Sequence, residues 1–359
     1  MHGSLKRGYV WILVLMMLLT PASNLASGNQ AKSTTVWSGI VTLTGGFTVD
    51  SNDVLVIQPG TTVRIDPSER IWINGRINVL GTHDSPVVFE SSGGDDHEGL
   101  QFNSSSLGMN SVIDNLTIKD SIYGLTIYHS DPTVNNLTVI NADKAAVDLF
   151  SQSSPIFNHL SIQGGGQDIH GSATSWRYGL GLSIGDGSTP IVRDLTIDGT
   201  MTRGLNIWGN SGGLIFNSSI SNISGATQAA SAGIWVEDSI PLISESLISR
   251  SDNGIIVRHQ SPGITTRPTF EEVVVENSQY RGVLVDQYNH SNFANLETIA
   301  IFKDIEVRGT GGPGAKTPGL GYVAFDVNTT GVKIVEGLIE DNPVIGLRVF
   351  VSDSSTNLT

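Results

Sequence analysis

A short motif recurs along most of the chain and restricts its fold more than any other feature. A glycine, or once an alanine, is followed by an apolar residue, any residue and a second apolar residue. The nine clear copies begin at Gly99, Gly124, Ala146, Gly181, Gly204, Gly233, Gly254, Gly282 and Gly346. Successive copies are 21 to 35 residues apart, except for a gap of 64 that contains a further unit near 321–325. A repeat of this period indicates a stacked, solenoid-like architecture.

A second motif follows the first at a nearly constant offset. It reads proline, any residue, apolar, two or three polar, apolar, any, apolar. Its copies begin at Pro132, Pro155, Pro190, Pro241 and Pro268. Both motifs alternate with period two, which is typical of strands with one buried side, and no window shows a sustained helical period. We therefore predict an all-β, parallel β-helix solenoid of roughly 13 rungs.

Composition agrees with a folded domain of this kind. Apolar residues make up 39% of the chain, too many for a disordered protein, while only 15% of residues are charged, which disfavours coiled coils and long surface helices. The 20 Lys and Arg face 34 Asp and Glu, so the net charge of -14 excludes nucleic acid as an expected partner. There is no cysteine, which removes disulfides, thiolate metal ligands and lipid attachment at an N-terminal cysteine.

The first residues have the composition of a targeting segment. Lys6 and Arg7 precede the apolar run 9–19, which a small polar stretch interrupts. We expect a secretory signal peptide over 1–28, an N-terminal cap with leading rungs over 29–90, and β-helix repeats over 91–359 with a truncated C-terminus. An uncleaved anchor is the alternative. The protein is thus expected to be secreted or on the cell surface, touching a membrane only through the signal segment or a missing C-terminal part.

The leading strands carry a family resemblance. The stretch 56–63, followed by 77–82 and 85–89, resembles the first rungs of secreted right-handed parallel β-helix proteins. The downstream glycine motifs resemble the repeats of the pectin-lyase-like superfamily. This resemblance implies the fold over nearly all of the chain after the signal segment. It does not imply one activity, because the superfamily includes lyases, hydrolases, tailspikes and non-enzymatic surface proteins, and the local signatures of its pectate lyases and polygalacturonases are not found here.

Stacking the glycine motifs predicts a cluster of charged side chains on neighbouring rungs. It contains Glu237, Asp238, Arg258, His259 and Asp286. Such a set could supply the carboxylates and the proton-abstracting base of a polysaccharide lyase or glycoside hydrolase. The alternative is a ladder of inter-rung salt bridges without a substrate.

Aromatic residues occupy outward or strand-end positions of the same stack. They are Tyr128, Trp208 and Trp235, together with Trp176, Arg177 and Tyr178 in an insertion that would overhang this side. Exposed rings at these positions would bind the apolar faces of sugars, whereas buried rings would only cover strand ends. A different column, formed by Asn115, Asn136 and His159, is expected to hydrogen-bond along one turn.

Two further motifs have residues found in cofactor-binding sites. The acidic turn around Asp95, Asp96 and Glu98 could bind Ca²⁺ or be a solvated loop; no other cofactor is expected. The glycine-rich stretch 309–317 differs from a phosphate-binding loop in spacing and is followed by no helix, so no nucleotide partner is expected.

The sequence therefore predicts a protein that binds polysaccharide or another extended extracellular ligand along its side. A polysaccharide lyase or glycoside hydrolase is the second hypothesis, and a structural or adhesive stalk is the third. Eight Asn-x-Ser/Thr sequons, at Asn103, Asn115, Asn136, Asn217, Asn222, Asn289, Asn328 and Asn357, fit a secreted glycoprotein.

Overall fold

The computed structural model describes residues 33–166, 179–225, 231–261, 264–287, 300–312, 322–329 and 331–349. The chain divides into two compact units, 1–31 and 32–359, and the description below concerns the second. The expected signal segment 1–28 lies outside the described residues. Among those residues, none forms a helix long and apolar enough to cross a membrane; the helical structure described is one 3-10 turn, Ser104–Ser106.

The strands form three parallel sheets that wrap around one interior, and each turn of the chain adds one strand to each sheet. The first sheet contains β1 (Thr34–Trp37), β4 (Val54–Ile57), β7 (Arg76–Leu80), β10 (Val112–Tyr128), β11 (Thr133–Phe150), β12 (Ile156–Gln163), β14 (Ile191–Asp198), β16 (Leu214–Ser221), β18 (Leu242–Ser249), β20 (Thr269–Glu276), β22 (Ile301–Arg308) and β24 (Lys333–Ile334). The second sheet contains β2 (Ile40–Leu43), β5 (Thr62–Ile65), β8 (Val87–Ser91), the later parts of β10 to β12, β14, β16, β18, β20 and β22, and β25 (Gly337–Glu340). The third sheet contains β3 (Phe47–Val49), β6 (Arg70–Ile73), β9 (Gly99–Phe102), the ends of β10 and β11, β13 (Leu180–Ile184), β15 (Arg203–Ile207), β17 (Ala232–Glu237), β19 (Asn253–His259), β21 (Arg281–Gln287), β23 (Val323–Asn328) and β26 (Ile345–Val349).

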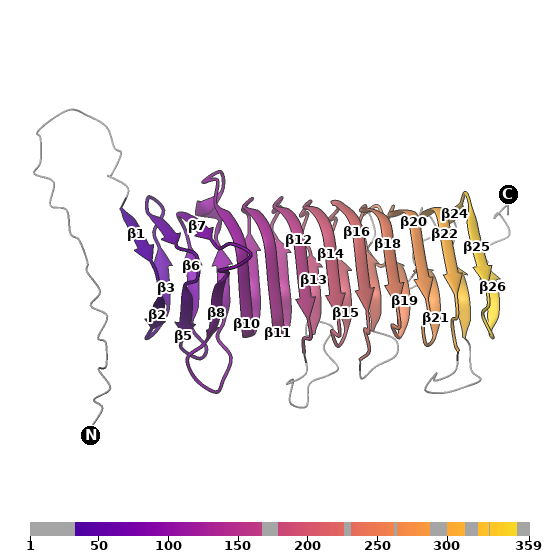
Figure 1. Cartoon of the computed structure of the whole chain (residues 1–359). Coiled ribbons are helices and arrows are strands. Elements are labelled where there is room, and N and C mark those ends of the chain that lie inside the picture. The colour runs from indigo at the N-terminus through magenta and orange to yellow at the C-terminus, as the bar shows by residue number, and fades with distance from the viewer. Residues whose placement is uncertain are drawn as a thin grey trace, which may run out of the picture. The chain divides into compact units, whose positions relative to one another are not determined.

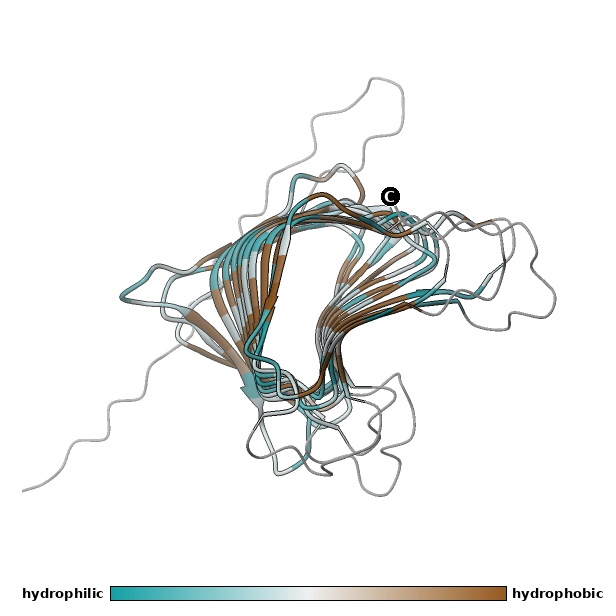
Figure 2. Ribbon diagram, turned by 90° about the vertical axis from the view of Figure 1, so that its right-hand side faces the viewer, coloured by the Kyte–Doolittle hydropathy of each residue, from teal (hydrophilic) through white to brown (hydrophobic). Residues whose placement is uncertain are grey.

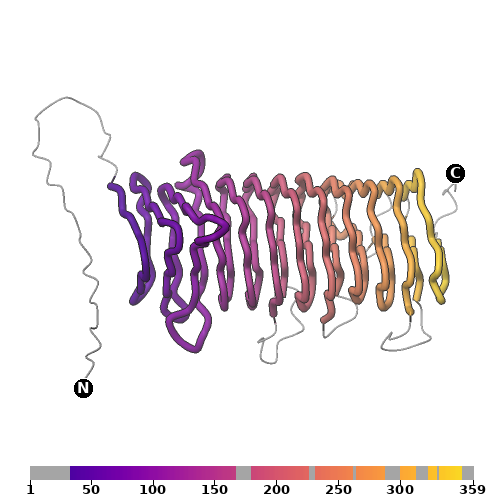
Figure 3. Tube along the Cα trace, viewed as in Figure 1, coloured from indigo at the N-terminus to yellow at the C-terminus, as the bar shows by residue number. Residues whose placement is uncertain are grey.

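The described part of the chain thus forms twelve rungs, each containing one strand, or part of a strand, from every sheet. Figures 1 and 3 show the rungs side by side in sequence order, from indigo to yellow. Rung 4 is β10, rung 5 is β11, and the last, rung 12, is β24 to β26. The expectation of roughly 13 rungs came from about 24 residues per rung, and insertions such as 164–179 make several rungs longer.

The two sequence motifs map onto different sheets. The glycine motif forms the third sheet, and the proline motif forms the first and second sheets. The strands expected between residues 54 and 90 are β4 to β8. The structure confirms the all-β parallel solenoid.

The interior is a continuous apolar core. Residues along each strand point alternately inward and outward, and the inward residues form this core. Figure 2 shows apolar residues along the strands that surround the interior. Near the C-terminal end, Phe302 stacks on Phe270 at 5.0 Å between ring centroids and meets Phe325 edge-on at 5.1 Å. All three rings are fully buried, and burying one such side chain contributes about 2–3 kcal/mol.

From rung 4 to rung 11, one residue in the left-handed conformation joins the first sheet to the second. These residues have φ between 47° and 61° and are Asn115, Asn136, His159, Asp194, Asn217, Glu245, Glu272 and Asp304. The expected hydrogen-bonding role is seen at Asn115, whose Nδ2 donates to the Gly81 carbonyl at 3.0 Å. The other two corners of each rung vary in length.

Candidate binding face

The outer face of the third sheet collects most of the side chains that could bind a ligand. Its central column runs in strand register through Thr126, Asp148, Ser183, Asn206, Trp235, Ile256, Leu284, Asp326 and Arg348. These residues point away from the core, yet several are buried: Asn206 is 0% exposed and Ile256 is 1% exposed. The face is therefore enclosed rather than freely solvated.

From rung 4 to rung 11, variation in rung length is confined to the corners that border this face. Only residues 250–252 separate β18 from β19, whereas 164–179 separate β12 from β13. At the other edge, 238–241 separate β17 from β18 and 260–268 separate β19 from β20. Loops on a rigid scaffold are where proteins usually place binding residues, so this pattern favours the third sheet as the functional face.

A pocket of about 420 Å³ lies on this face between rungs 9 and 12. It is lined by Ile256, Arg258, Arg281, Leu284, Asp286, Asp326, Asn328 and Arg348. Ile256 and Leu284 belong to a small buried apolar cluster and form its floor. The polar lining contains three guanidinium groups and two carboxylates.

Ion pairs hold these charges in place. Arg258 Nη2 lies 3.5 Å from Asp286 Oδ2, and Asn328 Nδ2 donates to Asp286 Oδ1 at 2.9 Å. The Asp326 carboxylate is shared by Arg281 Nε at 3.2 Å and Arg348 Nη2 at 2.6 Å. Hydrogen bonding to Asp326 raises the pKa of Arg348. Because one carboxylate serves two guanidinium groups, the pocket keeps one positive charge in excess.

The structure separates the predicted charged cluster into two groups. Arg258 and Asp286 line the pocket, and Glu237 pairs in register with Arg258. Asp238 and His259 instead lie buried at the following corner, 3.3 Å apart. There, Asp238 Oδ1 accepts the backbone N–H groups of residues 260 and 261 at 2.8 and 3.2 Å, which is the bonding of a structural turn.

Trp235 is buried at 2% exposure, which agrees with the second of the two alternatives for the outward rings, a buried ring that covers strand ends. The Arg203 guanidinium, from the preceding rung, lies 3.7 Å from its ring centroid, and that of Arg258, from the following rung, lies 4.8 Å away. The indole N–H donates to Glu237 Oε2 at 3.1 Å. Burial lowers the pKa of Arg203 to about 9, although Glu237 opposes the shift. Trp235 therefore positions the arginines by cation–π contact.

The other predicted aromatic residues differ in accessibility. Tyr128 is 39% exposed and contacts Phe150 edge-on at 5.3 Å. Trp208 is partly buried, and its ring covers Gly185, where an added Cβ would lie 2.3 Å from the ring. Trp176, Arg177 and Tyr178 lie outside the described residues.

Asp148 is a site residue that the sequence analysis did not single out. It lies between Thr126 and Ser183 in the central column. Desolvation of the carboxyl group by its surroundings raises its pKa to about 6, while a hydrogen bond with Ser183 opposes the shift. A polar residue at one outward position of a repeat gives no sequence signal for such burial.

The raised pKa of Asp148 predicts a pH-dependent stability. The folded protein binds the Asp148 carboxyl proton more tightly than the unfolded chain does. The stabilisation of the folded state by this proton is complete below about pH 4 and is lost as the pH rises through about 6. Asp148→Asn should therefore increase the free energy of unfolding by about 1–2 kcal/mol at pH 8 and leave it nearly unchanged at pH 3.5. Urea titrations at both pH values measure this difference. Asp304→Asn, at an exposed bend, is the control, and an equal gain at both pH values would contradict the prediction.

The acidic turn does not assemble a metal site in the structure. Glu98 forms an ion pair with Arg70, and the Asp96 carbonyl accepts the Ser68 N–H at 2.9 Å. Within the described ranges, no three His, Asp or Glu side chains could hold a metal ion. His97 is fully buried, with Nε2 3.1 Å from the Lys119 carbonyl, and desolvation lowers its pKa to about 4.

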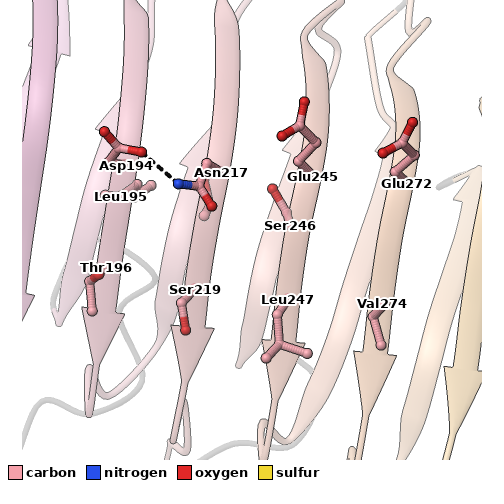
Figure 4. Close-up of a pocket in the computed structure, with 11 residues that line it drawn as sticks. Asp194, Leu195, Thr196, Asn217, Ser219, Glu245, Ser246, Leu247, Glu272 and Val274 are labelled. Atoms are coloured by element: carbon pink, nitrogen blue, oxygen red, sulfur yellow. Dashed lines mark hydrogen bonds between the residues drawn. The ribbon is translucent and has the colours of Figure 1, made fainter.

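A second pocket, of about 400 Å³, lies on the outside of the second sheet beside the single-residue bend. Figure 4 shows Asp194, Asn217, Glu245 and Glu272 following one another along neighbouring rungs. Asn217 Nδ2 donates to Asp194 Oδ1 at 2.6 Å. This row continues the column of Asn115, Asn136 and His159 expected from the sequence, and among its described contacts the Asp194–Asn217 pair bonds along the axis.

One family model matches part of the chain. Residues 158–298 match the family model described as a right handed beta helix region. This segment is therefore similar to right-handed β-helices. The match covers rungs on both sides of Trp235 and confirms the fold-level resemblance noted above.

Solved structures similar to this β-helix include two enzymes. Alginate lyase from Paenibacillus sp. str. FPU-7 shares 15% identity with a TM-score of 0.48, and the match covers 82% of this chain and 99% of that one. The catalytic unit of a thermostable GH87 alpha-1,3-glucanase from Streptomyces thermodiastaticus strain HF3-3 shares 14% identity with a TM-score of 0.48, covering 88% of this chain and 63% of that one. The comparison with curated proteins found no match.

Proposed function

We propose that this chain is a secreted or cell-surface β-helix protein that binds a polysaccharide along the outer face of its third sheet. The observation that carries the proposal is the pocket over rungs 9 to 12, with its apolar floor and its three guanidinium groups. Extended polymers fit a surface whose features repeat at a constant interval. Rungs are about 4.8 Å apart, close to the length of one pyranose unit in an extended chain.

The charge of the pocket favours acidic sugar units. Arg281 uses only Nε toward Asp326 among its described contacts, so its Nη atoms can bind a carboxylate or sulfate. Arg348 lies on the opposite side of Asp326 in the strand register and already donates through Nε and Nη2. The local positive excess contrasts with the net charge of -14 of the whole chain.

Binding is favoured over cleavage because the pocket carboxylates are engaged. Asp286 accepts from Arg258 and Asn328, and Asp326 accepts from Arg281 and Arg348. A carboxylate held by guanidinium groups is a weak general base. The lyase or hydrolase hypothesis is tested by the same experiment, since the pocket does bring charges of both signs together.

The test exposes the protein to a panel of acidic and neutral polysaccharides and measures retention, unsaturated product and new reducing ends together. We expect retention of an acidic polysaccharide without product, and Arg281→Gln should weaken binding about tenfold by removing a charge-assisted contact. Arg308→Gln is the matched control, because Arg308 pairs with Glu276 on the second sheet.

Three outcomes would contradict the proposal. Product that disappears in Arg258→Ala would make the protein an enzyme. Absence of both retention and product would leave the structural stalk. Equal weakening by Arg281→Gln and Arg308→Gln would show that binding depends on net charge rather than on the pocket. Export of the mature chain from cells expressing residues 1–359 tests the location.

A further inference from the structure

The other half of the third sheet's outer face, over rungs 4 to 7, differs in chemistry from the charged pocket. Its central column contains hydroxyl, carboxyl and amide groups, from Thr126, Asp148, Ser183 and Asn206. Two residues further along the same strands, Tyr128 pairs in register with Phe150. Aromatic rings therefore lie beside a row of hydrogen-bonding groups.

The aromatic rings have the geometry of a corner rather than of a closed stack. Tyr128 and Phe150 meet at an interplanar angle of 69°, so the partly exposed Tyr128 ring has Phe150 as a side wall. Gly185 follows Ile184 on the next rung, and the Trp208 ring lies over it beside Phe150. A sugar ring placed on Tyr128 would bury its C–H face against an aromatic surface.

Asp148 is the one member of the polar row that is only partly buried, so it is the partner available to sugar hydroxyls. Asp148 has no ion-pair partner among the described residues and hydrogen-bonds with Ser183. A partly buried carboxyl in this setting favours a hydrogen-bond donor without charge, and it repels a second carboxylate. Thr126 and Ser183, on the flanking rungs, are buried at 6% and 2% exposure and enclose the sides of this carboxyl group.

We infer that rungs 4 to 7 form a second saccharide subsite, built from Tyr128, Phe150 and Asp148, that takes uncharged sugar units. This inference rests on the proposed function and narrows its ligand: a chain that fills both subsites combines neutral units with acidic ones. Rung 4 and rung 12 are eight rungs apart, about 38 Å at the usual strand spacing. Filling both subsites therefore needs about eight pyranose units.

The test measures binding of an oligosaccharide array by calorimetry. The array contains chains of three and of eight units derived from neutral, uniformly uronated and mixed neutral–acidic polysaccharides. We expect mixed octamers to bind at least tenfold more tightly than trimers, because the two subsites act on one chain. Tyr128→Ala should weaken octamer binding about fivefold or more and leave the binding of acidic trimers unchanged. Tyr128→Phe should retain most of the affinity, since the ring is kept.

A matched variant separates the subsite from a general loss of structure. Phe216→Ala removes a ring of similar size from the outer side of the first sheet and should leave every affinity unchanged. Wild-type octamer affinity in Tyr128→Ala would overturn the second subsite alone, as would uniformly uronated octamers that bind as tightly as mixed ones. Failure of the wild-type protein to bind any chain in the array would overturn the proposed function, and the second subsite with it.

Discussion

Replacing Phe302 by alanine is expected to lower the free energy of unfolding by about 3–5 kcal/mol. The ring is fully buried, stacks on Phe270 at an interplanar angle of 7° and meets Phe325 at 79°. Its loss would leave a cavity that the flanking rungs cannot close, because their strands are fixed by hydrogen bonds on both sides. Urea unfolding followed by intrinsic fluorescence and by circular dichroism measures the change.

Phe216→Ala is the matched control for this substitution. Phe216 belongs to the same sheet but is an outward residue and is only partly buried, so its loss should cost about 1 kcal/mol or less. Similar costs for the two substitutions would contradict the assignment of Phe302 to a tightly packed interior.

Gly99→Ala is expected to prevent normal folding of the early rungs, with a cost of about 3 kcal/mol or more. Gly99 has φ of +86°, and an added Cβ would lie 1.9 Å from the Tyr123 carbonyl oxygen and 2.5 Å from that of Gly124. These atoms belong to β10, whose backbone stacks directly on β9. Relieving the clash would therefore separate two rungs.

Gly108→Ala isolates the conformational part of this effect. Gly108 has φ of +68°, but an added Cβ would meet nothing within 4 Å, so only the left-handed conformation is penalised, by about 1 kcal/mol. Soluble expression and the urea midpoint of the two variants provide the comparison. A Gly99→Ala protein as stable as Gly108→Ala would show that the rungs can move apart cheaply.

Repetition is what made the fold predictable from sequence. The glycine of the motif at Gly282 lies where a Cβ would be 2.5 Å from the Ala324 carbonyl and 2.3 Å from a Val307 methyl group. This crowding recurs at Gly233 and Gly254, so one physical constraint appears in the sequence many times. The alternation of apolar and polar residues then predicted the inward and outward positions correctly along the same strands.

The candidate site was less predictable because alternation distinguishes the two sides of a sheet but not exposure. Trp235 was correctly placed as outward, yet neighbouring rungs bury it between two arginines. Asp238 and Asp286 both occupy strand ends, but only Asp286 reaches the pocket. The sequence analysis did not identify Arg281 and Asp326. These two residues contact each other but are 45 residues apart in the sequence, and the repeat alone does not reveal that pairing.

The single-residue bend between the first and second sheets has a consequence for how such a chain can change. Inward and outward positions alternate on both sides of the bend, so adding one residue beside Asn217 would reverse the orientation of every side chain beyond it in β16. The core residues of β16 beyond the bend would then face water. From rung 4 to rung 11, insertions and deletions can therefore accumulate only at the two other corners. This part of the protein has one side of constant length, and the loops that border the third sheet can change to suit new ligands.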